Sequence, residues 1–157
     1  MKVHIAADHA GFELREALLA HLASRDDVEV VDHGAFVYDK MDAYPPMCIA
    51  CGEAVVADLN TGEEALGVVI GGSGNGEQMA ANLVDGVRAA LIWNESTAAL
   101  AREHNDANVC ALGARQHTID EAVRLVDVFI NTPFSNDERH LDRIKMMAEY
   151  EEVRCDD

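Results

Sequence analysis

The stretch LGVVIGGSGNGE, residues 66–77, decides the fold. Its first five residues are apolar and include three β-branched side chains, which is typical of a strand buried on both faces. A glycine-rich loop follows at 71–76, and a helix is expected from 77 to 83. A buried strand that leads through a short loop into a helix is the repeating unit of a parallel α/β sheet.

The alternation of strands and helices continues on both sides of this unit. Further strands are expected at 3–7, 28–31, 87–93 and 109–112, and further helices at 11–25, 47–57 and 95–103, with two more after residue 118. The pattern predicts a three-layer αβα, Rossmann-like (flavodoxin-like) fold with a parallel five-stranded sheet and helices on both faces. Residues 1–157 are expected to form one domain.

Capping residues are expected to open several of these helices. Asn94 suits the cap of the helix at 95–103. Thr118 with Glu121, and Ser135 with Glu138, both match the capping-box spacing.

The last helix, at about 136–154, is long and mixed in character. Its face with Ile144, Met147 and Tyr150 requires a partner. The partner is either the body of the protein or a second chain.

Charge and composition exclude several classes of function. The 157 residues contain 12 Lys and Arg against 29 Asp and Glu, so the net charge is −17. Nucleic acids and anionic membranes repel such a chain, and an anionic ligand requires the few cations to gather at one point. No run approaches the roughly 18 apolar residues of a membrane span, and the first residues resemble a strand rather than a targeting peptide. Four cysteines without a disulfide framework favour a reducing, cytoplasmic location.

The glycine loop allows several interpretations. A Walker phosphate loop requires Lys and Ser or Thr after the last glycine, where Glu77 and Gln78 stand. A dinucleotide fingerprint requires glycine at position 77 and follows the first strand of the sheet, not the third. A tight turn with no further role needs fewer glycines. A nest of backbone amides for an oxyanion formed during catalysis fits best.

Glu77 is either a first-turn acid that stabilises its helix or a general base held against this nest. A base that removes a proton next to a carbonyl needs the resulting negative charge to be held elsewhere. Ser73 and the loop amides are the candidates for that role.

Several separated motifs occur in one order along the chain: ADHAG at 7–11, GGSGNGE at 71–77, AREHNDAN at 101–108, and Arg139-His140 followed by Arg143. This set resembles the ribose-5-phosphate isomerase B family over about residues 2–150. The resemblance implies an aldose–ketose isomerase of the pentose phosphate pathway that uses neither metal nor cofactor. Ribose 5-phosphate and ribulose 5-phosphate would interconvert through ring opening and an enediolate.

The resemblance also assigns the proton carriers. Many members of the family have a cysteine base at the first position of the glycine loop, which here is Gly71. The chain therefore resembles the subgroup that uses the glutamate after the loop, Glu77. His104 would protonate the ring oxygen, although a histidine in the last turn of a helix also suits the helix dipole.

The remaining site residues bind substrate by the same resemblance. Asp8, which also suits a helix cap, would lie at the sugar hydroxyls and His9 at the phosphate. Tyr44 would contact the sugar; the family commonly has Asp-Tyr-Pro there, and Ala43 replaces the acid. The loop contributes Gly72, Gly74, Asn75 and Gly76, and Asn105 would lie against the enediolate.

Three arginines are the expected phosphate ligands. Arg115 follows a strand, and Arg139 and Arg143 share one helix face, where they either bind the phosphate or pair with Glu138 or Asp142. The resemblance places Arg139, His140 and Arg143 in the site of a neighbouring subunit. It thus implies a homodimer with shared sites and a C-terminal helix that crosses to the partner, and it leaves a tetramer open.

Three alternatives remain. In the first alternative, the substrate is a hexose 6-phosphate such as galactose or allose 6-phosphate. The sequence leaves this open because it does not define the length of the pocket. A non-catalytic sugar-phosphate or nucleotide-binding module is the other class, although it has no use for a paired base and acid. Cys48 and Cys51 have the spacing of a redox pair or half a zinc site, but two small core residues of one helix are the preferred interpretation.

Overall fold

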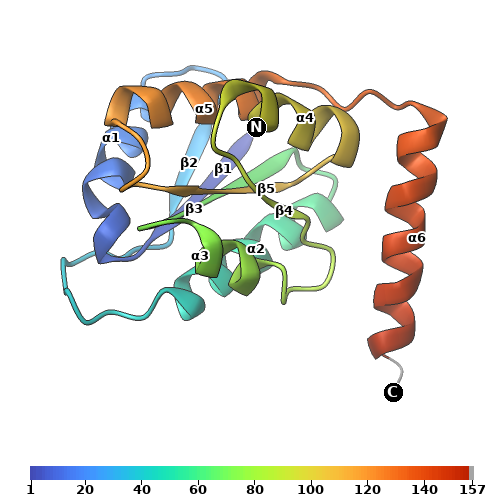
Figure 1. Ribbon diagram of the computed structural model, residues 1–157, viewed down its shortest axis with the longest axis horizontal. Coiled ribbons are helices and arrows are strands. Elements are labelled where there is room, and N and C mark those ends of the chain that lie inside the picture. The colour runs from blue at the N-terminus through green and yellow to red at the C-terminus, as the bar shows by residue number, and fades with distance from the viewer. Residues whose placement is uncertain (156–157) are drawn as a thin grey trace.

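The computed structural model describes residues 1–155 and has the predicted three-layer architecture (Figure 1). Five parallel strands lie in the order β2-β1-β3-β5-β4. They are β1 (Lys2–Ala7), β2 (Glu29–Asp32), β3 (Ala65–Gly71), β4 (Ala89–Leu91) and β5 (Val109–Gly113). The flavodoxin-like part of the expectation is wrong in this respect, because the flavodoxin order is 2-1-3-4-5 and here the last two strands are exchanged. β3 is buried along its whole length, as its apolar sequence predicts.

Helices cover both faces of the sheet. On one face lie α1 (Phe12–Ala23), α4 (Glu95–Asn105) and α5 (Ile119–Asn131), whose apolar sides pack around Phe129. On the other face lie α2 (Tyr44–Asn60) and α3 (Asn75–Ala81), which pack through Cys48, Cys51 and Val55. The two cysteines are free and buried, so their interpretation as core residues is confirmed; the Cys155 side chain lies outside the described part.

The last helix, α6 (Glu138–Cys155), stands apart from the three layers (Figure 1). An extended segment, 132–137, links it to α5. A groove of about 520 Å³ separates α6 from edge strand β4, and Ile144 and Met147 of α6 line it. None of the helices within residues 1–155 has the length and apolarity that a bilayer crossing needs.

Two of the three expected helix caps are confirmed. Asn94 Oδ1 accepts a hydrogen bond from Thr97 N, and Thr118 forms a capping box with Glu121. The expected cap at Ser135 is wrong. α6 begins two residues later than expected, and Asp137 accepts the hydrogen bond from Arg139 N, while Ser135 Oγ bonds His140 Nδ1 at 2.8 Å.

Candidate active site at two edges of the sheet

The glycine loop leaves the carboxyl end of β3, next to the carboxyl ends of β1 and β5. This is the position at which open parallel sheets bind ligands. The N–H groups of Ala114 and Arg115 donate to the carbonyl oxygens of Gly71 and Gly72, so the loop is attached to the segment after β5. Gly74 has a φ of +83°, a left-handed conformation that turns the chain into α3 and that L side chains rarely adopt.

Glu77 lies in the first turn of α3 and is only 4% exposed. Its carboxylate folds back against Gly71, where no side chain occupies the space. Burial raises the pKa of Glu77, and the nearby charge of Asp8 raises it further. A buried carboxylate with a raised pKa beside a nest of amides is equipped to accept a proton.

Two other loop glycines, Gly72 and Gly76, also lie close to expected site residues. A Cβ on Gly76 would lie 2.5 Å from the Tyr44 hydroxyl oxygen, and a Cβ on Gly72 would lie 3.2 Å from Arg115 Nη1. Ser73 is exposed, and its Oγ accepts a hydrogen bond from Asn75 N. The loop backbone is therefore in direct contact with an aromatic hydroxyl and a guanidinium.

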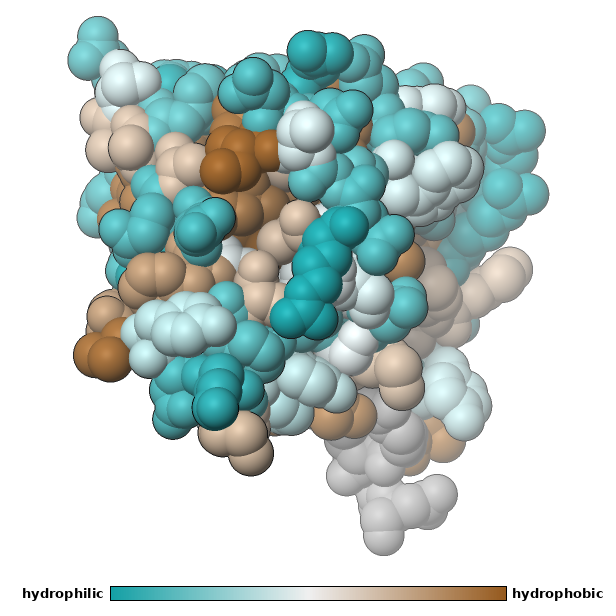
Figure 2. Space-filling view, turned by 60° about the vertical axis from the view of Figure 1, so that its left-hand side comes forward, coloured by the Kyte–Doolittle hydropathy of each residue, from teal (hydrophilic) through white to brown (hydrophobic). Residues whose placement is uncertain are grey.

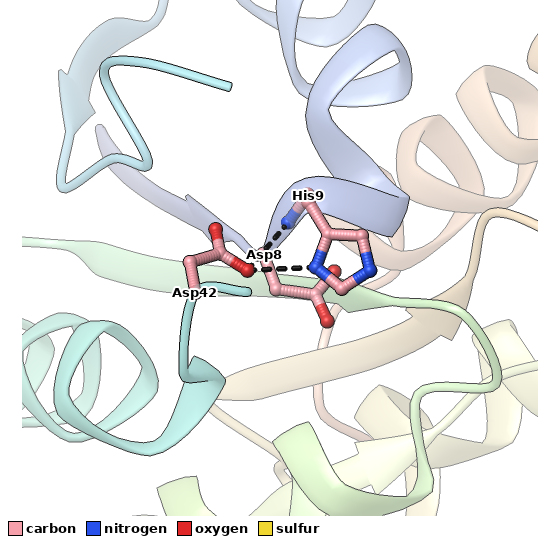
Figure 3. Close-up of side chains that lie close together, drawn as sticks. All are labelled: Asp8, His9 and Asp42. Atoms are coloured by element: carbon pink, nitrogen blue, oxygen red, sulfur yellow. Dashed lines mark hydrogen bonds and ion pairs between the residues drawn. The ribbon is translucent and has the colours of Figure 1, made fainter. Parts of the chain in front are cut away.

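Asp8 and His9 follow β1 at the same edge. Asp8 Oδ1 accepts hydrogen bonds from the N–H groups of Ala10 and Gly11, so it caps the 3₁₀ helix η1 (His9–Gly11). His9 donates through its backbone N–H and bonds through Nδ1 to the same oxygen, Oδ1 of Asp42 (Figure 3). Asp42 was not singled out from the sequence; the one available signal is an acidic residue two positions before Tyr44.

Five of the expected site residues lie far from this edge: His104, Asn105, Arg139, His140 and Arg143. His104 and Asn105 end α4, and Asn105 O accepts a hydrogen bond from Arg88, the residue before β4. They therefore lie at the amino edge of the sheet. Since β5 has five residues, the two edges are separated by roughly 17 Å at about 3.3 Å per residue.

The amino-edge group is held together by packing and hydrogen bonds. The rings of His104 and His140 lie 4.3 Å apart between centroids. His140 is buried, and burial, together with the charges of His104 and Arg139, lowers its pKa. Ser135 N donates to Glu103 O, which ties the segment before α6 to α4.

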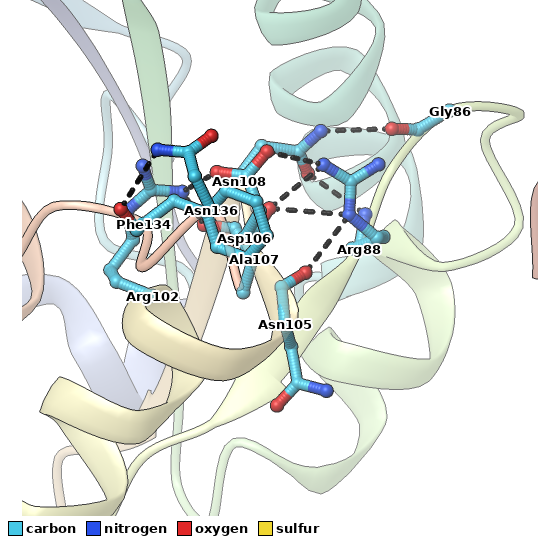
Figure 4. Close-up of polar contacts among 9 residues, drawn as sticks. All are labelled: Gly86, Arg88, Arg102, Asn105, Asp106, Ala107, Asn108, Phe134 and Asn136. Atoms are coloured by element: carbon cyan, nitrogen blue, oxygen red, sulfur yellow. Dashed lines mark hydrogen bonds and ion pairs between the residues drawn. The ribbon is translucent and has the colours of Figure 1, made fainter. Parts of the chain in front are cut away.

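A network of polar contacts fixes the turn that carries Asn105 (Figure 4). Asp106 adopts a left-handed conformation with φ of 43°, and its carboxylate accepts from Arg88 and from Arg102. Asn108 accepts from Arg88 N and donates to Gly86 O. The residues of the 101–108 motif therefore form a hydrogen-bonded turn that fixes the end of α4, which carries His104 and Asn105.

The three arginines expected at the phosphate differ from the others of the chain. Arg115, Arg139 and Arg143 are exposed, and within residues 1–153 none of them forms an ion pair with a carboxylate. Arg15, Arg25, Arg88, Arg102 and Arg124 all do. Pairing of Arg139 or Arg143 with Glu138 or Asp142, one of the interpretations of the sequence, is absent among these residues. The Arg139 guanidinium instead lies 3.3 Å from His140 Nε2. In a chain of net charge −17, guanidinium groups without a carboxylate partner are available for an anion.

The fold and the carboxyl edge define a Rossmann-like α/β protein with a buried carboxylate of raised pKa beside a glycine-rich loop at the ligand-binding edge of its sheet. Residues 3–147 match the Ribose/Galactose Isomerase family, and the chain belongs to this family.

Known relatives resemble the chain over nearly its whole length. It is 50% identical to ribose-5-phosphate isomerase B of Mycolicibacterium paratuberculosis over 151 residues, 96% of this chain and 92% of the relative. The Escherichia coli protein of the same name is 34% identical over 98% of both chains. The ribose-5-phosphate isomerase B of Mycoplasma genitalium, solved with bound ribulose 5-phosphate, superposes with a TM-score of 0.88 at 38% identity, over 96% of each chain.

Proposed function

We propose that this chain interconverts ribose 5-phosphate and ribulose 5-phosphate. Membership of the family and the ribulose 5-phosphate bound to the Mycoplasma genitalium relative support this substrate pair. The observation that carries the reaction type is the buried carboxylate of Glu77 at the glycine loop. A module that only binds a sugar phosphate gains nothing from an anionic side chain buried beside its anionic ligand.

In the proposed reaction, Glu77 removes the proton from C2 of the open-chain aldose. The electrons of the C–H bond form the C1–C2 double bond, and the negative charge moves to O1. Ser73 and the N–H groups of 72–76 stabilise this enediolate. After the proton of the C2 hydroxyl moves to O1, Glu77 returns its proton to C1, and the ketose results.

The remaining roles are proposed from the resemblance of the motifs to the family. His104 donates a proton to the ring oxygen as the furanose opens, and Asn105 contacts the enediolate. Asp8 and Tyr44 bind the sugar hydroxyls. The phosphate lies among His9 and the guanidinium groups of Arg115, Arg139 and Arg143, with His140 beside them.

We further propose that each site is shared between two subunits of a homodimer. Glu77 and His104 of one chain lie at opposite edges of the sheet, so one chain does not bring the base and the acid to one sugar. A second copy related by a two-fold axis would supply His104, Asn105, Arg139, His140 and Arg143 to the Glu77 of the first, with α6 crossing to the partner. The separation of α6 from the body and the groove along β4 support this assembly.

We also propose a cytoplasmic location. It is supported by the buried, unpaired state of Cys48, Cys51 and Cys110, which suits a reducing compartment.

A substrate panel tests the proposed reaction. Ribose 5-phosphate, allose 6-phosphate and galactose 6-phosphate are offered to the wild type and to Glu77→Gln, and aldose–ketose conversion is followed by NMR. We expect turnover of ribose 5-phosphate that the variant loses. Turnover confined to a hexose would change the substrate, and binding without turnover would favour the module.

Solvent exchange separates the two proton transfers. Ribulose 5-phosphate is open-chain, so deuterium uptake at its C1 from D₂O reports the Glu77 step without ring opening. His104→Ala should slow ribose 5-phosphate turnover far more than this exchange, whereas Glu77→Gln should abolish both. Equal losses on both readouts in His104→Ala would remove His104 from ring opening.

A further inference from the structure

His9 has a second carboxylate beside it that the proposed reaction does not use. Asp42 lies in the segment 33–43, which connects β2 to α2 and which the fold brings against η1 (Figure 3). Its Oδ1 lies 2.7 Å from His9 Nδ1 and 3.1 Å from His9 N. The side chains of His9 and Asp42 are 25% and 14% exposed, so the pair is largely shielded from water.

The chemistry of this contact defines the state of the imidazole ring. A carboxylate accepts only, so Nδ1 carries the proton and donates it to Asp42. The other ring nitrogen, Nε2, is left for a ligand. Because one oxygen accepts from both the backbone and the ring, it restricts rotation about both side-chain bonds of His9.

The side chain of Asp42 has no other hydrogen bond or ion pair among the described residues. Its Oδ2 is buried and receives no hydrogen bond from residues 1–153. Asp8, the other acid beside the ring, uses Oδ1 to cap η1. Tyr38 lies edge-on to His9, at 6.3 Å between ring centroids.

We propose that Asp42 is a positioning residue that accepts the Nδ1 proton of His9 and so directs the opposite ring nitrogen, as Nε2–H of the doubly protonated ring, to donate a hydrogen bond to the phosphate of the substrate. This inference rests on the proposed function. Asp42 itself does not touch the substrate, so it acts on affinity for the phosphate and not on the proton transfer at Glu77.

Four variants test the proposal: Asp42→Ala, His9→Gln, the double variant, and the control Asp39→Ala. Asp39 lies in the same segment, and its side chain accepts a hydrogen bond from Met41 N. Its backbone oxygen, which accepts from Asp42 N, stays in place in Asp39→Ala, so this variant controls for general loosening of the segment. We expect Asp42→Ala to raise the KM for ribose 5-phosphate about tenfold with kcat changed less than twofold. In the His9→Gln background the same substitution should have no further effect, and Asp39→Ala should leave KM unchanged.

Two readouts do not depend on turnover. Long-range ¹H–¹⁵N spectra of the phosphate-bound protein should show His9 with protons on both ring nitrogens in the wild type and with a proton on Nε2 alone in Asp42→Ala. Titration with inorganic phosphate should show the same tenfold loss of affinity. An equal KM increase with and without His9, or a His9 ring that keeps its Nδ1 proton in Asp42→Ala, would overturn the inference. A wild type that binds phosphate but does not isomerise would overturn the proposed function alone.

Discussion

The carboxylate of Glu77 occupies the space that a Cβ at position 71 would need. Gly71 ends β3 and Glu77 lies one loop later, in the first turn of α3. Any side chain at 71 would therefore displace the proposed base. A cysteine at 71 and a glutamate folded back from 77 exclude each other sterically, which explains why the chain carries one without the other.

The first prediction follows from this contact. Gly71→Ala should abolish turnover, because the new methyl group displaces the Glu77 carboxylate. Forcing an extra methyl group into a packed site also costs typically about 1–3 kcal/mol of the free energy of unfolding. In the double variant Gly71→Ala/Glu77→Ala the clash is gone, so urea unfolding should show most of the lost stability restored while turnover stays absent. A double variant no more stable than Gly71→Ala would contradict the steric account.

Removal of the charge at Glu77 should separate activity from stability. Glu77→Gln is expected to lower kcat by at least about 10²–10⁴, the typical contribution of a general base. Because burial raises the pKa of Glu77 above its ordinary 4.5, the ionised form is disfavoured in the folded state at neutral pH. Tm at pH 7 should therefore not fall. Only the ionised carboxylate can accept a proton, so wild-type kcat should decrease as the pH falls through the pKa of Glu77, which lies above 4.5.

The arginines without a carboxylate partner should contribute to binding but not to folding. Arg139→Ala should raise the KM for ribose 5-phosphate by about 10- to 100-fold, since a hydrogen bond to a charged group contributes about 1.5–3 kcal/mol, and should leave Tm unchanged. The matched control is Arg102→Ala, which removes contacts to Asp106 Oδ1 and Ala107 O and should lower Tm. If Arg139→Ala destabilises the chain as much as Arg102→Ala does, Arg139 has a structural role.

Subunit mixing tests the shared site. Glu77→Gln and Arg139→Ala alter opposite edges, so a mixed dimer has one site with both defects and one with neither. Random exchange makes half of the dimers mixed, and recovery should approach about a quarter of wild-type activity for a C₂ dimer. The control mixes Glu77→Gln with Asp8→Ala, which alter the same edge, so no mixed dimer has an intact site. Equal recovery in both mixtures, with exchange verified, would contradict the shared site.

The free energy of unfolding should depend on pH through the protonation of His33. Its Nε2 lies 2.8 Å from Nδ1 of buried His4, and burial and the His4 charge lower the pKa of His33. An unfolded histidine takes up its proton near pH 6.5. Below that pH, and down to the lowered pKa, the unfolded chain binds the extra proton, so stability falls as the pH decreases, by at most about 1.4 kcal/mol per pH unit. Urea midpoints between pH 8 and 5 should show this loss, and His33→Gln should reduce the slope.

The order of strands and helices was predictable from the sequence because each element carries its own period of apolar residues. β3, buried throughout, and the capping box of Thr118 with Glu121 are local features, and both are confirmed. Ser135 was misassigned because the capping pattern spans four residues and does not register the competing bond to His140. The family could also be identified from the sequence, because several separated motifs in one order rarely occur together outside a single family.

The relations between distant segments depended on the tertiary structure. The sequence designates Glu77 and His104 as base and acid, but only the sheet shows that one chain holds them at opposite edges. Asp42 lies 33 residues from His9 along the chain and meets it only because the 33–43 segment folds against η1. Sequence periodicity reports which face of an element is buried, whereas a shared site depends on where the ends of different elements meet, and packing alone decides that.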